Sequence, residues 1–399
     1  MFMANRAHLH RKGLLAAAYS CMFLFGFILL LMGSMLPSLQ VSYVQSGNLG
    51  SIPLAGILTA TVLVGPLLDK LGAKIILSFG LALIAVSLGA IPWLHHYAAL
   101  IGAAFVYGIG GGLLNTAANA LVAGLAESGR ATALNFLGLF FSLGAIAAPL
   151  LMSSLGGGMS PSTVLPVLAA LAMAILIPTV LLDFPRSAAS RPGLAPLLSV
   201  LAHPAVWLFG GLLFFESGSE NCMFVWSSKI VALLTGASAQ QANLALVGLS
   251  AAFGLGRLLA VLWIRWLGNR GTIWLSCAMA ALGALFASAN QTFLSATAGI
   301  FVVGLGLSAI FPTVLGLAAD RFPKETGTVF GAIISMALVG GTTGPSLAAR
   351  LAEVGPARVF WIPITAAAAV AIFTAILTRR IGNPTHASRT AASPIARKP

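Results

Sequence analysis

Charged residues are scarce in this sequence of 399 residues. They make up 7% of the chain, whereas hydrophobic residues make up 59%. A soluble globular protein carries roughly 25% charged residues, and no soluble fold could bury this much apolar surface. The scarcity of charge therefore excludes a soluble protein and indicates a chain that lies within a lipid bilayer.

Cysteine is also rare, with three residues at Cys21, Cys222 and Cys277. They are far apart in the sequence and do not have the spacing of metal ligands. We therefore expect neither a disulfide framework nor a metal site. The sequence also lacks a glycine-rich loop that could hold phosphate groups, so we expect no nucleotide or other cofactor and no ATP-driven activity.

Apolar blocks long enough to cross a bilayer recur along the whole chain. A transmembrane helix needs about 20 mostly apolar residues, and the polar residues between such blocks mark the loops. The pattern predicts an all-α membrane protein of twelve transmembrane helices. They are expected near residues 13–38, 49–68, 75–94, 98–124, 131–154, 162–183, 204–232, 241–263, 272–289, 292–318, 328–350 and 358–378.

Basic residues are distributed unevenly around these helices. With the N-terminus in the cytoplasm, only Arg350 and Arg358 of the 21 basic residues fall in an outer loop, and Lys229 and Arg257 fall within helices. This is the positive-inside bias, and it predicts a multi-pass protein of the plasma (inner) membrane with both termini in the cytoplasm. Because the bias explains the formal net charge of +13, we expect no nucleic-acid partner.

The two halves of the sequence are related by a shift of 196 residues. The shift maps Gly72 to Gly268 and Pro149 to Pro345. We therefore expect two six-helix bundles in parallel repeat, at residues 1–186 and 204–399, joined by a cytoplasmic linker at 187–203. Transporters built in this way have their substrate site near the bilayer midplane, between the halves, and work by alternating access.

The loop after the second expected helix carries a motif. It reads Gly-Pro-Leu-Leu-Asp-Lys-Leu-Gly-Ala-Lys from Gly65 to Lys74, and it resembles the signature loop of the major facilitator superfamily. The resemblance implies the twelve-helix fold of that superfamily and a conformational latch at the cytoplasmic helix ends. An acid there can favour a helix N-terminus or pair with an arginine in one conformation only. The alternative is a tight turn that only serves the positive-inside bias.

The residues expected in the latch come from both halves. In the second half Arg265 stands where the first half has its acid, so other partners are needed there, such as Arg257 with Asp320. The full set of candidates is Asp69, Lys70, Lys74, Arg130, Arg257 and Asp320.

Two further stretches resemble a narrower group, the fucose permease and related sugar symporters. Asn115-Thr-Ala-Ala-Asn119 is similar to a Glu-Thr-Ala-Ala-Asn stretch of that group, and Gly218-Ser-Glu220 with Trp226 is similar to its Gly-x-Glu and downstream Trp. Acids that the fucose permease uses in helices 1 and 4 are here Gly33 and Asn115. The resemblance therefore does not transfer the proton site of that protein.

Only two acidic residues are expected at membrane depth. The chain has eight acidic residues, and all except Glu216 and Glu220 fall at expected loops or helix ends. An ionisable group in the hydrocarbon region costs about 3 kcal/mol or more, and residues i and i+4 share one helix face. Two such carboxylates are not readily ionised together, so we expect Glu220 to couple transport to an ion and Glu216 to modulate it. The alternative is a structural pair satisfied by neighbouring polar groups.

The expected substrate-binding residues are mainly amides. Asparagine offers both donors and acceptors to a neutral polyhydroxy ligand, and a Trp ring offers a face to a sugar. The candidates are Asn115, Asn119, Trp226, Asn221 and Asn135. The alternatives are interhelical hydrogen bonds for the asparagines and an interfacial anchor for the Trp.

The sequence as a whole predicts a secondary active transporter rather than an enzyme. We expect a monomer in the lipid bilayer that moves a small neutral polar solute, such as a monosaccharide or polyol, in symport with a proton or sodium ion. The alternative is proton-coupled efflux of hydrophobic compounds by antiport.

Overall fold

The computed structural model describes residues 2–94, 96–125, 130–154, 161–184, 199–289, 292–322 and 326–381. Within these ranges the chain is helical apart from short turns and connections, and it contains no strand. This confirms the predicted all-α class. Most of the predicted linker at 187–203 lies outside the described residues.

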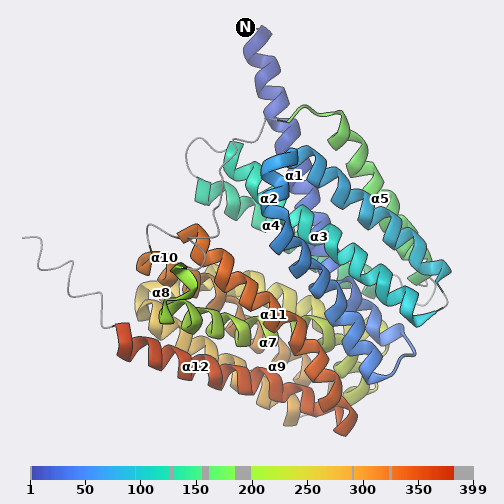
Figure 1. Ribbon diagram of the computed structural model, residues 1–399. Helices are drawn as coiled ribbons and strands as arrows, with labels where there is room; N and C mark the ends of the chain where they lie inside the picture. The colour runs from blue at the N-terminus through green and yellow to red at the C-terminus, as the bar shows by residue number, and fades with distance from the viewer. Residues whose placement is uncertain are drawn as a thin grey trace, which may run out of the picture.

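The helices form two groups of similar size (Figure 1). The N-terminal half contains α1 (Phe2–Met35), η1 (Leu36–Ser38), α2 (Tyr43–Ala90), η2 (Ile91–Trp93), α3 (Tyr97–Leu125), α4 (Arg130–Ser154) and α5 (Pro161–Leu181). The C-terminal half contains α7 (Pro204–Thr235), α8 (Ala239–Ala289), α9 (Phe293–Ser308), α10 (Ile310–Arg321), α11 (Thr326–Val354), η3 (Pro356–Phe360) and α12 (Trp361–Ile381).

Two of these helices, α2 and α8, each contain a sharp kink at a glycine. The backbone is left-handed at Gly72 (φ 80°) in α2 and at Gly268 (φ 69°) in α8, a conformation that favours glycine because it has no Cβ. Each helix therefore contributes two membrane spans. Ten segments are long and apolar enough to cross a membrane, and one of them is the whole of α8. With α7, whose charged residues interrupt its apolar pattern, the described helices provide the twelve predicted spans.

The same local structure recurs at the predicted shift of 196 residues. Ser42 and Gln45 form a capping box at the start of α2, with the Ser42 hydroxyl 3.2 Å from the Gln45 amide nitrogen. Ser238 and Gln241 form the equivalent pair at the start of α8, at 3.3 Å. The kinks at Gly72 and Gly268 obey the same shift. The two halves are therefore structural repeats that run in the same direction.

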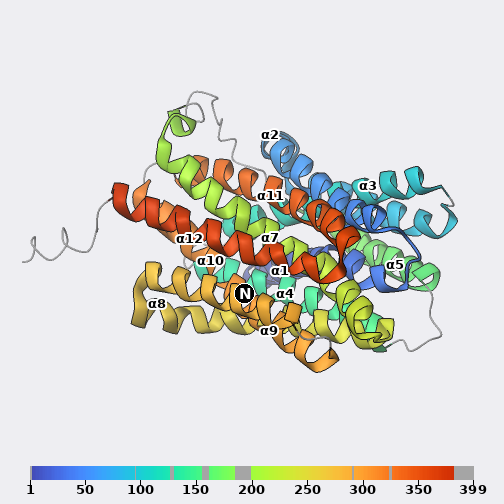
Figure 2. The same ribbon diagram turned by 90° about the horizontal axis from the view of Figure 1, so that it is seen from below.

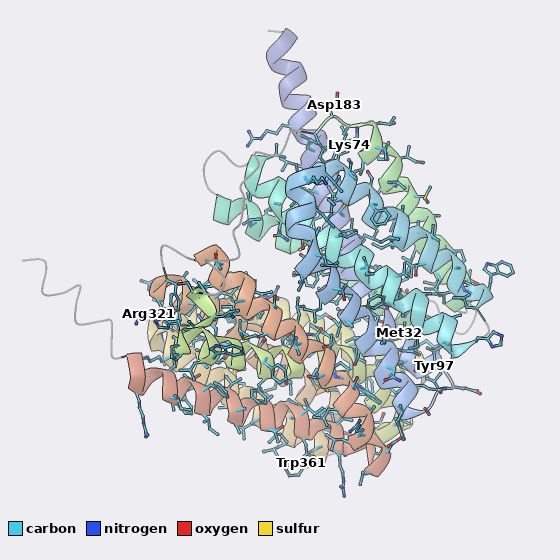
Figure 3. The ribbon with its side chains drawn as sticks, viewed as in Figure 1. Met32, Lys74, Tyr97, Asp183, Arg321 and Trp361 are labelled. Atoms are coloured by element: carbon cyan, nitrogen blue, oxygen red, sulfur yellow. The ribbon has the colours of Figure 1, made fainter. Side chains whose placement is uncertain are left out.

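The halves lie side by side and meet at one end of the molecule, as two perpendicular views show (Figures 1 and 2). Lys74 and Asp183 lie at one end of the N-terminal half, whereas Tyr97 lies at the other (Figure 3). We call the end that carries η1 the η1 end. There α1 and α2 of the first half pack against α7 and α11 of the second.

Candidate functional site

The two predicted carboxylates lie near the middle of α7. The helix starts at Pro204 after a cap by His203 and ends before Gly236, whose left-handed backbone (φ 66°) terminates it. Glu216 is completely buried, at 0% exposure, and Glu220 is half-buried one turn further along. Both carboxyl groups therefore lie well inside the bundle, on one side of the helix.

Glu216 has no hydrogen-bond donor for either carboxylate oxygen among the described residues. The charged groups that act on it are the Glu220 carboxyl and the guanidinium of Arg257 on α8. Arg257 also acts on Glu220. A buried carboxylate without a donor is costly, so the three side chains form one electrostatic unit, which we call the Glu216–Glu220–Arg257 triad.

Arg257 faces the space between the two halves. Asn243, Ser250 and Arg257 follow one another on α8 at seven-residue intervals, which places them on one face of the helix. At the η1 end of this face the Asn243 amide donates to the Ser34 carbonyl of α1, at 3.1 Å. Arg257 is two further intervals along and is exposed.

The second predicted latch pair does not form. No hydrogen bond or ion pair joins Arg257 to Asp320 among the described residues; Arg257 interacts with the α7 carboxylates instead. Asp320 lines a cavity of about 240 Å³ together with Arg270 and Arg321. Sequence spacing alone could not separate these partners, because three helices contribute them.

The remaining latch residues are only partly described. Lys70 is exposed and Lys74 is half-buried. The side chains of Asp69 and Arg130 lie outside the described residues, as does the side chain of the substrate-binding candidate Asn135.

Three predicted amides are half-buried and partly engaged by their own helices. The Asn119 amide nitrogen donates to the backbone carbonyl of Asn115 at 2.8 Å and lies 3.0 Å from its side-chain oxygen. The Asn221 amide nitrogen donates to the Ser217 carbonyl at 2.9 Å. Among the described residues these bonds leave the amide nitrogen of Asn115 and the amide oxygens of Asn119 and Asn221 without a partner. These atoms could serve a polar ligand.

Trp226 differs from its predicted role. It is completely buried, and its indole nitrogen donates to the Pro345 carbonyl of α11 at 3.0 Å. Its ring also packs near Tyr43, with 6.4 Å between ring centres. In this conformation the ring has no face free for a sugar, because it fills the contact between α7, α11 and the start of α2.

Lys229 is a functional candidate that the sequence prediction missed. This buried lysine of α7 reaches across to the N-terminal half, where its amino group donates to the Ser46 hydroxyl at 2.6 Å and to the Val41 carbonyl at 3.2 Å. It also lies 5.9 Å from the centre of the Tyr43 ring. The signal was present in the sequence as a lone charge within a transmembrane helix. Its partners, however, come from a distant part of the chain.

Other hydrogen bonds between the halves gather at the same end. The Ser346 hydroxyl of α11 donates to the Ser51 hydroxyl of α2 at 2.8 Å, and the Ser153 hydroxyl of α4 donates to the Gln240 carbonyl of α8 at 3.0 Å. Together with Lys229 these bonds close the η1 end of the space between the halves.

Comparison with known proteins gives the family. The Major Facilitator Superfamily model matches residues 14–234 and 213–398. An uncharacterized MFS-type transporter of Yersinia pestis is 25% identical over 312 residues, which cover 77% of this chain and 77% of that protein.

Solved structures show the same fold. The nucleoside transporter NupG matches with a TM-score of 0.78 at 14% identity, over 93% of this chain and 99% of its own. The fucose:proton symporter FucP of E. coli matches with a TM-score of 0.64 at 20% identity, over 91% and 98%. Transporters of this kind are not enzymes. The chain belongs to the Major Facilitator Superfamily and is a multi-pass membrane transporter.

Proposed function

We propose that this transporter carries a small neutral polar solute, such as a monosaccharide or polyol, in symport with a proton. The observation that carries the proposal is the buried carboxyl pair of α7, in which Glu216 has no hydrogen-bond donor among the described residues. A carboxylate kept at this depth without a donor is most easily explained if it binds and releases a proton during the cycle.

The triad sets the number of protons. When all three side chains are ionised, one guanidinium balances only one of the two carboxylates, and a single negative charge remains. A net charge is costly in a low-dielectric interior, so one bound proton makes the unit neutral. We therefore expect one proton per cycle, with Glu220 as the coupling residue because it is the more accessible of the two carboxyl groups.

The solute class is supported by the amides. Asn115, Asn119 and Asn221 retain unpaired amide atoms, and they carry no charge that would select an ionic solute. FucP is named as a symporter of the sugar fucose and NupG as a transporter of nucleosides, which is compatible with a polar solute.

The conformation is explained by alternating access. If both termini lie in the cytoplasm of a cell with one inner (plasma) membrane, the η1 end faces outward. The closed η1 end then corresponds to an inward-facing state. Release of Lys229 from Ser46 and Val41 would open the outward path. Lys70, Lys74, Asp69, Arg130 and Asp320 would act at the cytoplasmic ends of the helices.

The test is uptake into proteoliposomes with the purified protein. Labelled monosaccharides and polyols are offered under an inward proton gradient, and separately under an inward sodium gradient. Glu220→Gln should accumulate no solute above the outside concentration, yet it should still exchange solute, because exchange needs no net proton movement. The matched control is Glu353→Gln, which makes the same chemical change at an exposed glutamate.

Gradient-driven accumulation by Glu220→Gln at the wild-type level would reject the assignment. Accumulation driven only by sodium would replace the proton by sodium. Proton-driven exclusion of hydrophobic compounds without sugar uptake would favour the antiport alternative.

A further inference from the structure

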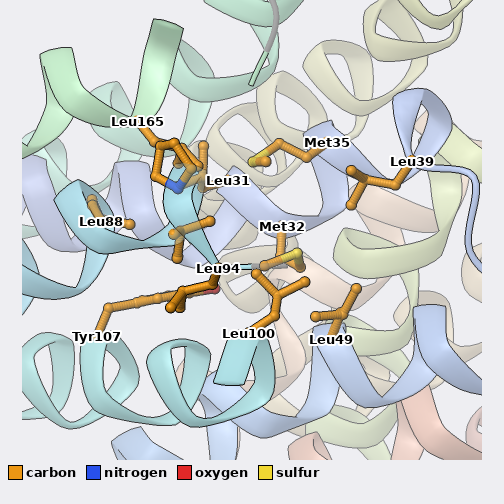
Figure 4. A pocket seen from close by; sticks show the side chains of 12 residues that line it. Leu31, Met32, Met35, Leu39, Leu49, Leu88, Leu94, Leu100, Tyr107 and Leu165 are labelled. Carbon is orange, nitrogen blue, oxygen red and sulfur yellow. The ribbon is translucent and has the colours of Figure 1, made fainter. Parts of the chain in front are cut away.

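A second cavity lies entirely within the N-terminal half, away from the carboxylates of α7. It has a volume of about 190 Å³ and is lined by residues of α1, α2, η2, α3 and α5. Its walls are leucine, isoleucine, methionine and proline side chains, with Tyr107 as the exception. The close-up view shows these side chains surrounding one space (Figure 4).

The hydroxyl of Tyr107 is unpaired at this cavity. The residue is 1% exposed, and its hydroxyl has no hydrogen-bond partner among the described residues. Figure 4 shows the ring extending from α3 toward Leu94 and Leu100, so that its hydroxyl end points into the cavity. A buried donor without an acceptor destabilises a fold, and a phenylalanine would fill the same space without that cost.

We propose that this cavity is a binding site for a small aromatic molecule with one hydrogen-bond acceptor, to which Tyr107 donates. The size argues for a single ring, because an apolar cavity of about 150 Å³ is known to hold benzene. The remaining volume allows a short substituent. The single donor in an otherwise apolar wall argues for a single acceptor, such as a carbonyl oxygen.

The site is placed to influence the closed η1 end. Met35 and Leu39 line the cavity, and Leu39 is two residues before Val41, whose carbonyl accepts a hydrogen bond from Lys229. A molecule in the cavity would support this segment from behind. We therefore assign the cavity a modulating role, separate from the path of the transported solute.

The test compares two probes of nearly identical shape. The protein in lipid nanodiscs is titrated with 4-fluoroacetophenone and with 4-fluoro-α-methylstyrene, in which a CH₂ group replaces the carbonyl oxygen, and binding is followed by fluorine NMR. Wild type should bind the ketone about five times more tightly than the alkene, as one hydrogen bond allows. Tyr107→Phe should bind both equally, and it also controls for partition into lipid.

Equal affinities in wild type, or no saturable binding of either probe, would overturn the proposal. So would a preference for the ketone that survives in Tyr107→Phe. The measurement uses binding alone, so its failure and a failure of the proposed symport can be told apart.

Discussion

At the scale of single residues, the carboxyl groups of α7 combine high cost with precise placement. Glu216 is fully buried, and Glu220 lies one turn away on the same side of the helix. Gly33 takes the position of an acid in the fucose permease resemblance, and it packs against the Phe224 carbonyl of α7, one turn beyond Glu220. An acid side chain would not fit at Gly33 in this conformation. The carboxyl function therefore lies on the other side of the interface between the halves.

Arg257 provides a prediction at this scale. Removing its charge by Arg257→Gln should destabilise the protein, because the two carboxylates lose their counter-charge. The change should cost less when Glu216→Gln is already present, with a coupling of roughly 1 kcal/mol in thermal unfolding. The matched control is Arg265→Gln, an exposed arginine of the same helix. Strict additivity of Arg257→Gln and Glu216→Gln would separate Arg257 from the triad.

Some of these residues were predictable from the sequence and some were not. Glu216 and Glu220 could be identified because no other acids fall inside the apolar blocks. The burial of Trp226 and the role of Lys229 could not, because Pro345 and Ser46 are far away in the sequence. A single sequence gives the cost of a buried group but not its partner.

At the scale of helices, close approach between glycine and backbone determines how the halves fit at the η1 end. A Cβ added at Gly33 would overlap the Phe224 carbonyl, and one added at Gly47 would lie 2.6 Å from the Cβ of Ala349. The twelve spans follow from the apolar pattern alone. The start of α2 at Tyr43 lies six residues before the predicted one, because the Ser42 and Gln45 capping box begins the helix ahead of the apolar run.

Gly33→Ala should therefore open the η1 end. Overpacking costs about 1–3 kcal/mol, so the open population should rise by about tenfold. The measurement is the maleimide labelling rate of a cysteine introduced at buried Ser46, in a background without the native cysteines. Gly102→Ala is the control, because a Cβ there meets nothing within 4 Å. An unchanged labelling rate in Gly33→Ala would show that this contact does not limit opening.

At the scale of the whole molecule, the repeat was predictable and the conformation was not. The shift of 196 residues recurs in the kinks at Gly72 and Gly268 and in the two capping boxes. The same sequence must fold into both an outward-facing and an inward-facing state if it transports by alternating access. The pattern of apolar residues therefore cannot select one of them.

A disulfide across the η1 end tests whether this closure must open. The hydroxyls of Ser51 and Ser346 are 2.8 Å apart, so the pair Ser51→Cys with Ser346→Cys should cross-link on oxidation. Solute exchange should then stop and return after reduction, whereas each single variant should be unaffected by oxidant. Full exchange in the cross-linked protein would mean that the halves need not separate here.

The central claim is that the α7 pair holds one proton when the site is buried. Infrared difference spectroscopy measures this directly and needs no knowledge of the solute, because a protonated carboxyl group has a C=O stretch distinct from that of a carboxylate. The purified protein at neutral pH should show one protonated carboxyl band that disappears in the Glu216→Gln, Glu220→Gln double variant and persists in Glu353→Gln. A wild-type spectrum without such a band, or one that the double variant retains, would contradict the account.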